Sequence, residues 1–265
     1  MIRGWYIGAS GMNAQQARLD AISNNLANVD TTGYKKDVAV SKSFPELLLR
    51  RMNDDGVYNT YFGSADAAPI IGKIGLGVET NEMYTILEQG SLKQTGSFQD
   101  MALNGEGFFT VLTPQGERYT RNGNFMAGKE GYLETKEGYP VLGEKGPIFV
   151  QDISFIVNED GIVYDDEQMQ EIDRFKIVRF DNERYLKKQG SSLYNSNDIS
   201  GSAHIAEGYE RPGLIQGYIE TSNVNVVNEM VSMIEVNRSY EANQKSIQAE
   251  DSMMTTLWTK VASIR

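Results

Sequence analysis

Apolar side chains recur every seven residues in the first thirty positions of the chain. The main row reads Trp5, Met12, Leu19 and Leu26, and a second row is apolar at Ile22 and Val29 but not at Gly8 and Gln15. A repeat of seven predicts an α-helix with one coiled-coil-like seam. Gly33 is a natural stop signal, so the predicted helix runs from about Ile2 to Val29.

A longer repeat occupies the other end of the chain. Its main row reads Val226, Met233, Tyr240, Ile247, Met254 and Val261. We expect the second row four residues after each of these, where the sequence reads Met230, Asn237, Gln244, Asp251 and Trp258. Asn223 or Asn225 can cap the first free amides, and no Pro or Gly follows Gly217, so the predicted helix continues to near Arg265.

The middle of the chain changes to a pattern of short strands and turns. A strand is predicted at 108–112, a turn at 114–116, another strand at 118–121 and a tight hairpin turn at Asn122-Gly123. Further strands are expected at 131–135, 140–143, 153–157, 162–164 and 175–180. This rhythm predicts a β-sandwich or barrel-like domain over about residues 71–222.

The segment between these regions has no clear period. Residues 45–49 are expected to begin a short helix, which Asn53-Asp54-Asp55-Gly56 would break, and the rest is read as a loop or adaptable linker. The sequence therefore predicts an α+β fold with paired, coiled-coil-like terminal helices flanking a central all-β domain. The expected parts are a discontinuous helical domain (1–34 with 223–265), a linker (35–70) and the β-rich domain (71–222).

Two interpretations of the terminal stripes stay open at this point. Each helix can pack on the protein's own core, as most amphipathic helices do. Alternatively the two helices pair antiparallel within one chain, which puts Trp5 near Trp258 and Leu26 near the start of the C-terminal helix. Two helices cannot bury both seams completely, so such a pair keeps apolar surface for neighbouring copies.

Charge separates the ends from the middle. The chain has a net charge of −11 and a pI of about 4.7, which argues against a nucleic-acid partner. Residues 1–51 carry seven basic and four acidic side chains, so the negative charge belongs to the middle. The chain has no run of apolar residues long enough to cross a membrane, and its first residues lack a signal-peptide pattern.

Candidate chemical sites are few. The chain has no Cys and one His, His204, so disulfides and thiolate zinc sites are excluded and no Ser-His-Asp elbow is present. Asn104-Gly105-Glu106-Gly107 lacks the Lys and Ser/Thr of a nucleotide loop and is read as a β-turn. The acidic runs at 159–160 and 165–167 lack calcium-loop spacing. We therefore expect no cofactor, no metal and no enzyme activity.

Several segments carry a family resemblance. Residues 21–35 (AISNNLANVDTTGYK) closely resemble the signature of the flagellar basal-body rod and hook proteins. Residues 104–109 (NGEGFF), 119–125 (YTRNGNF), 220–226 (ETSNVNV) and 235–241 (EVNRSYE) resemble further motifs of that family, in the family's order. The resemblance covers nearly the whole chain and is weakest at 35–70 and 145–215.

The resemblance implies a structural, axial subunit of the rod that polymerises through its terminal helices. Its partners would be copies of itself, other rod proteins and the flagellar export apparatus, and it would reach the periplasmic rod without a cleaved signal peptide. Its opening residues favour a proximal-rod subunit; a distal-rod or hook subunit, and a cell-wall-acting module with flagellar-type helices, are the alternatives.

The expected assembly interface combines both helical stripes with two amides of the signature. Asn24, Asn25 and Asn28 lie beside the apolar seam, where they either fix its register or simply end the helix and make a turn. The expected interface comprises Trp5, Met12, Leu19, Ile22, Asn25, Leu26, Asn28, Val29, Val226, Met233, Tyr240, Ile247, Met254, Trp258 and Val261.

Overall fold

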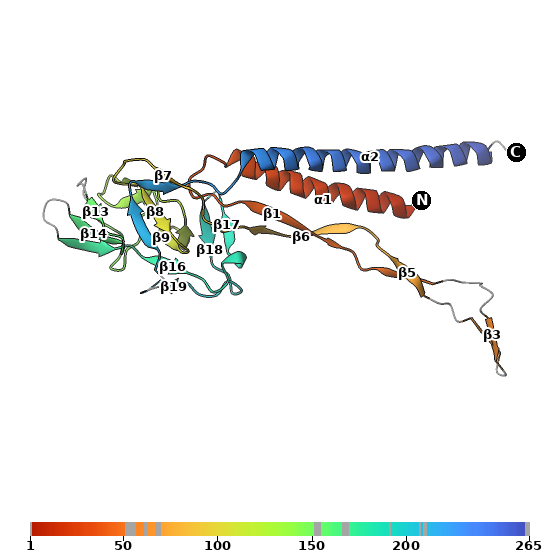
Figure 1. Cartoon of the computed structure of the whole chain (residues 1–265), viewed down its shortest axis with the longest axis horizontal. Coiled ribbons are helices and arrows are strands. Elements are labelled where there is room, and N and C mark those ends of the chain that lie inside the picture. The colour runs from red at the N-terminus through yellow and green to blue at the C-terminus, as the bar shows by residue number, and fades with distance from the viewer. Residues whose placement is uncertain are drawn as a thin grey trace. The chain divides into compact units, whose positions relative to one another are not determined.

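Along the chain, one long helix comes first and another last, and the described strands come between them in sequence; Figure 1 labels both helices. In this computed structural model α1 covers Ile2–Ala27 and α2 covers Val226–Ala262. The structure describes residues 2–50, 57–60, 63–66, 70–150, 155–165, 170–190, 192–206, 208 and 211–262. The arrangement confirms the α+β class, with a terminal helix on each side of a β-rich middle.

The start of α2 and the turn that follows α1 lie where the sequence predicts them. Asn225 caps α2, because its side-chain oxygen accepts a hydrogen bond from the amide of Asn228 at 3.1 Å. Gly33 follows α1 with φ +67°, and its amide donates to the carbonyl of Glu220 at 2.8 Å. A side chain at Gly33 would collide with the backbone of Arg121 and Asn122, so this turn needs glycine for its space as well as its conformation.

The segment after α1 forms a β ribbon. Strand β1 (Asp37–Ser43) pairs with β6 (Val78–Thr85), and β2 (Leu47–Arg50) pairs antiparallel with β5 (Ile70–Ile74). Strands β3 (Val57–Thr60) and β4 (Gly63–Asp66) also pair. The short helix expected at 45–49 is wrong, because the leucines of β2 hydrogen-bond to a distant strand and this pairing overrides local helix propensity. The expected breaker at 53–56 lies outside the described residues.

The β-rich region is built on one six-stranded sheet, in the order β17-β18-β10-β9-β16-β19. These strands are Lys187–Gln189, Leu193–Asn195, Gly116–Thr120, Phe108–Thr113, Ile177–Arg179 and His204–Ile205. The smaller pairs are β7–β21 (Leu92–Gln94, Tyr218–Glu220), β8–β20 (Met101–Asn104, Gly213–Gln216) and β11–β12 (Phe125–Ala127, Leu133–Thr135). A three-stranded sheet contains β13 (Phe155–Val157), β14 (Ile162–Asp165) and β15 (Glu171–Arg174), and η1 is a 3-10 turn at Glu183–Tyr185.

Most expected strands are confirmed, with one instructive error. The strands predicted at 108–112, 118–121, 131–135, 162–164 and 175–180 overlap β9, β10, β12, β14 and β16, whereas 140–143 makes only isolated bridges. Asn122-Gly123 is not a hairpin turn, because β10 pairs with β9 and β18 and the chain then leaves this sheet. A Cβ at Gly123 would lie 1.6 Å from the carbonyl oxygen of Met101, so the glycine serves a close backbone approach.

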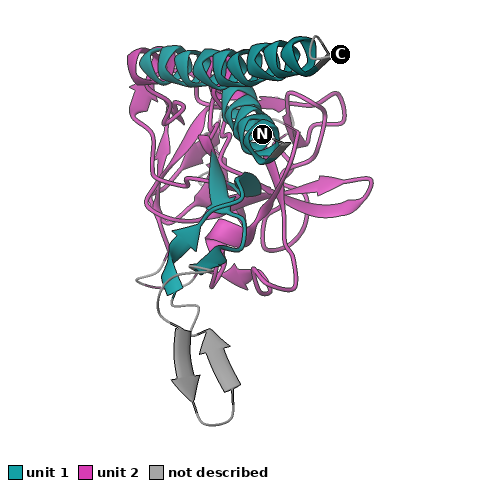
Figure 2. Ribbon diagram, turned by 90° about the vertical axis from the view of Figure 1, so that its right-hand side faces the viewer, with its two compact units in different colours: residues 1–21, 39–83, 231–265 teal, residues 22–38, 84–230 magenta. Residues whose placement is uncertain are grey.

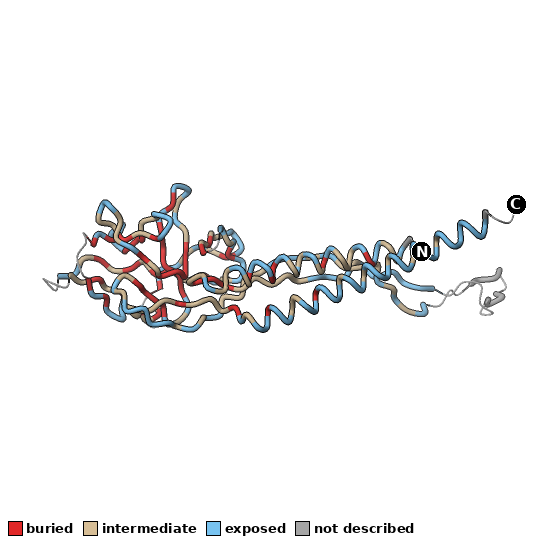
Figure 3. The backbone as a smooth tube through the Cα atoms, turned by 90° about the horizontal axis from the view of Figure 1, so that it is seen from above, coloured by how far each residue is buried: buried red, intermediate tan, exposed pale blue. Residues whose placement is uncertain are grey.

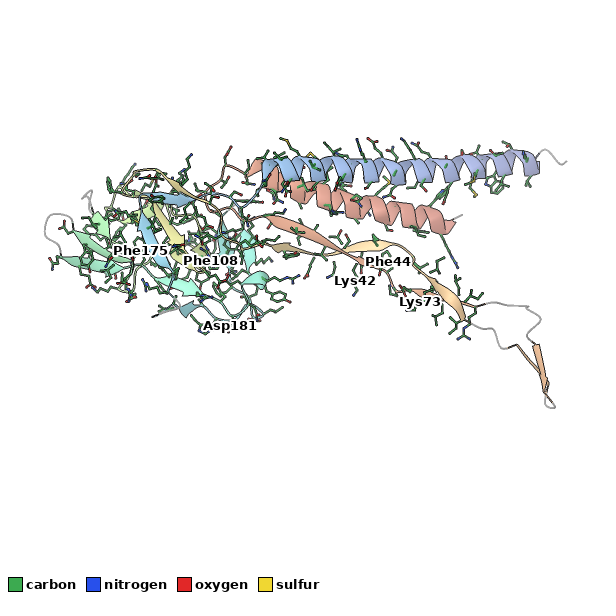
Figure 4. The ribbon with its side chains drawn as sticks, viewed as in Figure 1. Lys42, Phe44, Lys73, Phe108, Phe175 and Asp181 are labelled. Carbon is green, nitrogen blue, oxygen red and sulfur yellow. The ribbon has the colours of Figure 1, made fainter. Side chains whose placement is uncertain are left out.

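Two apolar clusters lie on opposite faces of β9. Phe109 packs against Phe125 and Phe175 at ring distances of 5.2 and 5.8 Å. Its neighbour Phe108 packs against Phe180 and Tyr194 instead, since adjacent side chains in a strand point to opposite faces. Figure 4 shows Phe108 and Phe175 within the β-rich region. One strand thus joins both parts of the core.

The chain divides into two compact units (Figure 2). Unit 1 contains residues 1–21, 39–83 and 231–265, which are most of both helices and most of the ribbon. Unit 2 contains residues 22–38 and 84–230, which include the β-rich core. Buried residues concentrate in unit 2, while the helices are largely half-buried or exposed (Figure 3).

Candidate assembly interface

The two helices pair antiparallel within one chain. Along α1, Gly4, Gly8 and Gly11 face Glu250, Ile247 and Asn243 of α2 in turn. Partner numbers fall as the α1 numbers rise, so the antiparallel arrangement expected within one chain is confirmed. A Cβ at Gly8 would lie 2.8 Å from Cγ1 of Ile247, and glycine therefore permits a closer approach than any other residue.

On α1 the contact face is displaced from the predicted row. Gly8, Ala14, Ala21 and Ile22 are buried, whereas Trp5, Met12, Leu19 and Leu26 are only half-buried, as are Asn28 and Val29. The glycine that interrupts the apolar repeat is thus part of the helix contact. Large side chains were expected to define the seam, but Gly4, Gly8 and Gly11 make close approaches to α2, because they let the two backbones come together.

On α2 the main predicted row is the one that faces inward. Val226, Met233, Tyr240, Ile247 and Met254 are all half-buried. The second row lies three residues after these positions, at Glu229, Val236, Asn243 and Glu250, and the first two of these are buried. The row expected four residues later is wrong, because Met230, Asn237, Gln244, Asp251 and Trp258 are exposed.

The expected proximity of Trp5 and Trp258 is also wrong. Gly4 already faces Glu250, and α2 continues for twelve more residues to Ala262, about 18 Å of helix. Figures 1 and 3 both show α2 running past the N-terminal end of α1. Val261 continues the main row of the seam and is 66% exposed, and Trp258 beside it is 69% exposed, so α1 does not cover this overhang.

A second exposed apolar stripe lies at the beginning of α2. It comprises Val227, Met230, Val231 and Ile234, spaced three or four residues apart on one face. Between this stripe and the overhang, the exposed positions of α2 are mainly polar. Such apolar stripes on a helix are typical of surfaces that are buried against another molecule.

Asn25 is the most highly connected residue of the signature. It is 1% exposed, and its amide nitrogen donates to the carbonyl of Asp37 at 2.9 Å and to Oε2 of Glu229 at 3.4 Å. Its amide oxygen accepts from the Tyr34 hydroxyl at 3.1 Å and from the Asp37 amide at 2.9 Å. A buried amide with these partners accepts only one register, which supports the register role for Asn25.

The other two asparagines act locally. Asn28 donates from its side chain to the carbonyl and the side-chain oxygen of Asn24, at 2.9 and 2.8 Å, in an exposed position. These bonds close the last turn of α1, so the turn-forming alternative describes Asn24 and Asn28 better.

Ion pairs surround the Asn25 network. Lys36 Nζ lies 2.8 Å from Oε1 of Glu229, and Lys188 Nζ lies 2.9 Å from Oδ2 of Asp37. Burial lowers the pKa of Lys188, and Asp37 opposes that shift. Burial likewise raises the pKa of Tyr34, over whose ring Lys188 lies at 3.7 Å. These contacts join the end of α1 to the start of α2.

A second network is fully buried. Lys35 Nζ contacts Oε1 of Glu220 at 2.5 Å, and Arg121 lies 3.6 Å from the other carboxylate oxygen. Burial lowers the pKa of both Lys35 and Arg121, while the Glu220 carboxylate opposes each shift. Lys35, Arg121 and Glu220 each belong to a different motif of the sequence, and sequence reasoning assigned no role to any of them.

Comparison with known proteins gives the same three-part pattern. A model described as flagella basal body rod protein matches residues 6–35, and one for the flagellar hook protein FlgE/F/G D1 domain matches 102–165. A model for the flagellar basal body rod FlgEFG protein C-terminal region matches 215–258. The flagellar basal-body rod protein FlgG of Buchnera aphidicola subsp. Schizaphis graminum is 38% identical over 97% of this chain and 99% of its own length.

The chain belongs to the flagellar basal-body rod family. FlgG of Bacillus subtilis is 35% identical over 97% of the chain and 98% of its own length. The flagellar hook-basal body complex protein FlhO of the same organism is 33% identical over the full length of both. In this rod-family chain, Lys35 falls within the first matched region and Glu220 within the last, so the buried ion pair joins two family regions.

Among the described residues, features of other kinds of site, such as a metal centre or a membrane span, are few. Within the described ranges, no group of His, Asp and Glu side chains could hold a metal ion, and no helix is long and apolar enough to cross a membrane. His204 is exposed and lies 3.5 Å from Asp181. Of the acidic run at 165–167, only Asp165 is within the described residues.

Proposed function

We propose that this protein is a structural subunit of the flagellar basal-body rod and assembles through its terminal helices. The observation that carries the proposal is the apolar surface left on α2 after the helices have paired. Val227, Val231 and Ile234 are exposed at one end, and Trp258 and Val261 at the other. Burying such side chains is favourable by about 1.5–3 kcal/mol each, so packing against further subunits is strongly driven.

The interface proposed here includes the main predicted row of each helix together with Asn25, and these residues have different roles. Half-buried residues such as Leu19, Leu26 and Tyr240 complete their burial against neighbours, whereas Asn25 holds the helix pair of one subunit in register. The proposed partners are copies of this chain, other rod and hook components, and the export apparatus. The role is structural, without catalysis, and the chain reaches the rod without cleavage of a signal peptide.

The position along the rod has two candidates. The opening residues of the chain favour a proximal-rod subunit, FlgF. The relatives named FlgG support the distal-rod alternative equally. The test is the location of a tagged copy in isolated basal bodies. Label next to the membrane ring supports the proximal position, and label next to the hook supports the distal one; absence from basal bodies contradicts the rod assignment.

Assembly through the helices is tested by Leu26→Asp and Ile234→Asp. A carboxylate in an apolar contact must be desolvated, so both variants are expected to abolish rod assembly and motility. The matched control is Gln244→Asp, an exposed polar position of α2. Thermal unfolding of the β-rich unit should be unchanged in Ile234→Asp. Normal rods with both variants would show that the helices do not form the interface.

A further inference from the structure

An apolar groove lies beside α1 in unit 1. It has a volume of about 580 Å³ and is lined by one face of α1, together with Phe44, Pro45, Leu47 and Leu76 of the ribbon. Figure 4 labels Phe44 on the ribbon. This volume lies within the range of about 300–1,000 Å³ that is typical of pockets for sizeable ligands. Several large side chains therefore fit in the groove.

Hydrogen bonds fix the walls of the groove. The Ser10 hydroxyl accepts from the amide of Val78 at 3.3 Å, and the Phe44 amide donates to the carbonyl of Gly77 at 3.0 Å. The α1 wall and the ribbon wall are thus bonded to the same short stretch of chain. The groove is a defined feature of this unit, with Tyr6, 71% exposed, at its edge.

The protein's own α2 cannot fill this groove. Arg3, Tyr6, Ser10 and Asn13 line it, with the spacing of one helix face, while Gly4, Gly8 and Gly11 contact α2. At 3.6 residues per turn the two faces are roughly 150° apart around α1. Figures 1 and 2 accordingly show α1 between α2 and the ribbon. The groove therefore remains open to a partner other than this α2, such as a second copy of the chain.

The overhang of α2 has the matching features. Leu257 and Val261 continue the two seam rows of α2 and are exposed, and Trp258 is exposed beside them, with Asp251 two turns before it. From Asp251 to Val261 the helix advances ten residues, about 15 Å, the same distance as from Arg3 to Asn13 along the groove. Both surfaces are apolar over this common length.

Opposite charges on the two surfaces indicate how the overhang is oriented in the groove. Arg3 is exposed at one end of the groove, and Asp251 is exposed at the beginning of the overhang. Neither side chain makes an ion pair within the part of the chain that the structure describes.

We propose that the overhang of α2 in one copy of this chain docks in the α1–ribbon groove of a second copy, with Trp258 in the groove and Asp251 beside Arg3. The inference rests on the proposed rod function and names the surfaces that meet. The overhang and the groove are different surfaces of the same subunit, so the contact between two copies is heterologous. Contacts of that type repeat from copy to copy and build open helical assemblies.

The test uses the absence of cysteine from the natural chain. Two differently tagged copies, one with Ala9→Cys and one with Trp258→Cys, are produced together in cells that lack the native gene. Basal bodies are isolated and oxidised mildly, and disulfides are sought that carry both tags. The matched control replaces Trp258→Cys with Ile234→Cys, an exposed apolar residue of the other stripe. A second pair, Asn13→Cys with Val261→Cys, covers the loss of the Trp258 side chain.

The expected result is a two-tag disulfide with either groove–overhang pair and at least tenfold less of it with the Ile234 control. Rods that contain both copies but show no such disulfide, or show it equally with the control, overturn the contact. So does cross-linking of the overhang only to a different flagellar protein. Absence of the tagged wild-type chain from basal bodies overturns the rod function instead. The presence of this chain is therefore measured before any cysteine is introduced.

A charge exchange gives an independent readout. Arg3→Glu and Asp251→Arg should each reduce the number of assembled rods several-fold, and the double variant should restore them, since the pair reforms between copies with the signs reversed. If the double variant assembles no better than the weaker single variant, the Arg3–Asp251 contact is excluded.

Discussion

The two units of this protein treat apolar side chains in opposite ways. In unit 2, Phe108, Phe109 and Phe175 are completely buried, and the buried charges of Lys35, Arg121 and Glu220 lie together. In unit 1, Leu48, Ile71 and Trp258 remain more than half exposed. A protein that functioned as a monomer would gain nothing from such exposure, since it promotes aggregation. Unit 2 thus completes a core of its own, whereas unit 1 carries much of the exposed apolar surface on which the proposed assembly rests.

Local stability should follow the same division. Three glycines in the first eleven residues of α1 each cost about 1 kcal/mol of helix propensity relative to alanine. Isolated helices are marginal in water, and this pair shares only one contact face. Opening of the helices at a free energy well below that of the core is therefore expected in the monomer.

The largest effect should come from the core of unit 2. Phe109→Ala removes a buried ring that contacts Phe125 and Phe175, and we expect a loss of about 4 kcal/mol in the free energy of unfolding. Trp258→Ala removes an aromatic ring from the overhang. This variant should change the free energy of unfolding of the monomer by no more than about 0.5 kcal/mol. Urea denaturation followed by circular dichroism measures both. Similar losses for the two variants would erase the contrast between the units.

Removing the buried carboxylate should be nearly as costly. Glu220→Gln leaves Lys35 and Arg121 without their counter-charge, and breaking a buried ion pair in this way costs about 3 kcal/mol. The matched control is Glu235→Gln on the exposed surface of α2, which should have no measurable effect. The measurement is the midpoint of urea denaturation, compared between the two variants. An unchanged midpoint for Glu220→Gln would mean that the network contributes little to unit 2.

A smaller effect, confined to the helices, is expected from Gly8→Leu. The new side chain meets Ile247 at the closest approach of the pair, and overpacking of this kind costs about 1–3 kcal/mol. Hydrogen exchange of the α1 amides should accelerate, while that of β9 stays constant. Gln16→Leu, at an exposed position of α1, serves as the control. Acceleration in β9 as well would show that the two units unfold together.

The mildest perturbation is limited proteolysis of the dilute monomer. The sequence predicts trimming of both ends to a core of about residues 71–222. Because Lys35 is fully buried against Glu220, we expect residues 22–38 to remain bound to that core even after cleavage elsewhere. Mass spectrometry of the fragments that co-purify identifies them. Full protection of the α2 overhang in the monomer would contradict the division into a complete and an incomplete unit.

The sequence left antiparallel pairing of the terminal helices as one of several interpretations, but by itself it determined the two helices and most strands. Periodicity suffices for this, because seven-residue and two-residue repeats report directly on which face of an element is buried. The long motifs also sufficed to identify the family, since an ordered run such as 21–35 rarely recurs by chance.

Only the tertiary structure decided what the elements meet. Gly8 reads as a defect in an apolar repeat, yet it sets the helix contact because it faces Ile247. The leucines of 47–49 favour a helix locally, yet they form a strand because residues 70–74 supply a partner. Lys35, Arg121 and Glu220 are far apart in sequence, and their burial is tolerable only because folding brings their charges together. Local pattern fixes which face of an element is apolar, whereas register and charge pairing depend on partners that are distant in the chain.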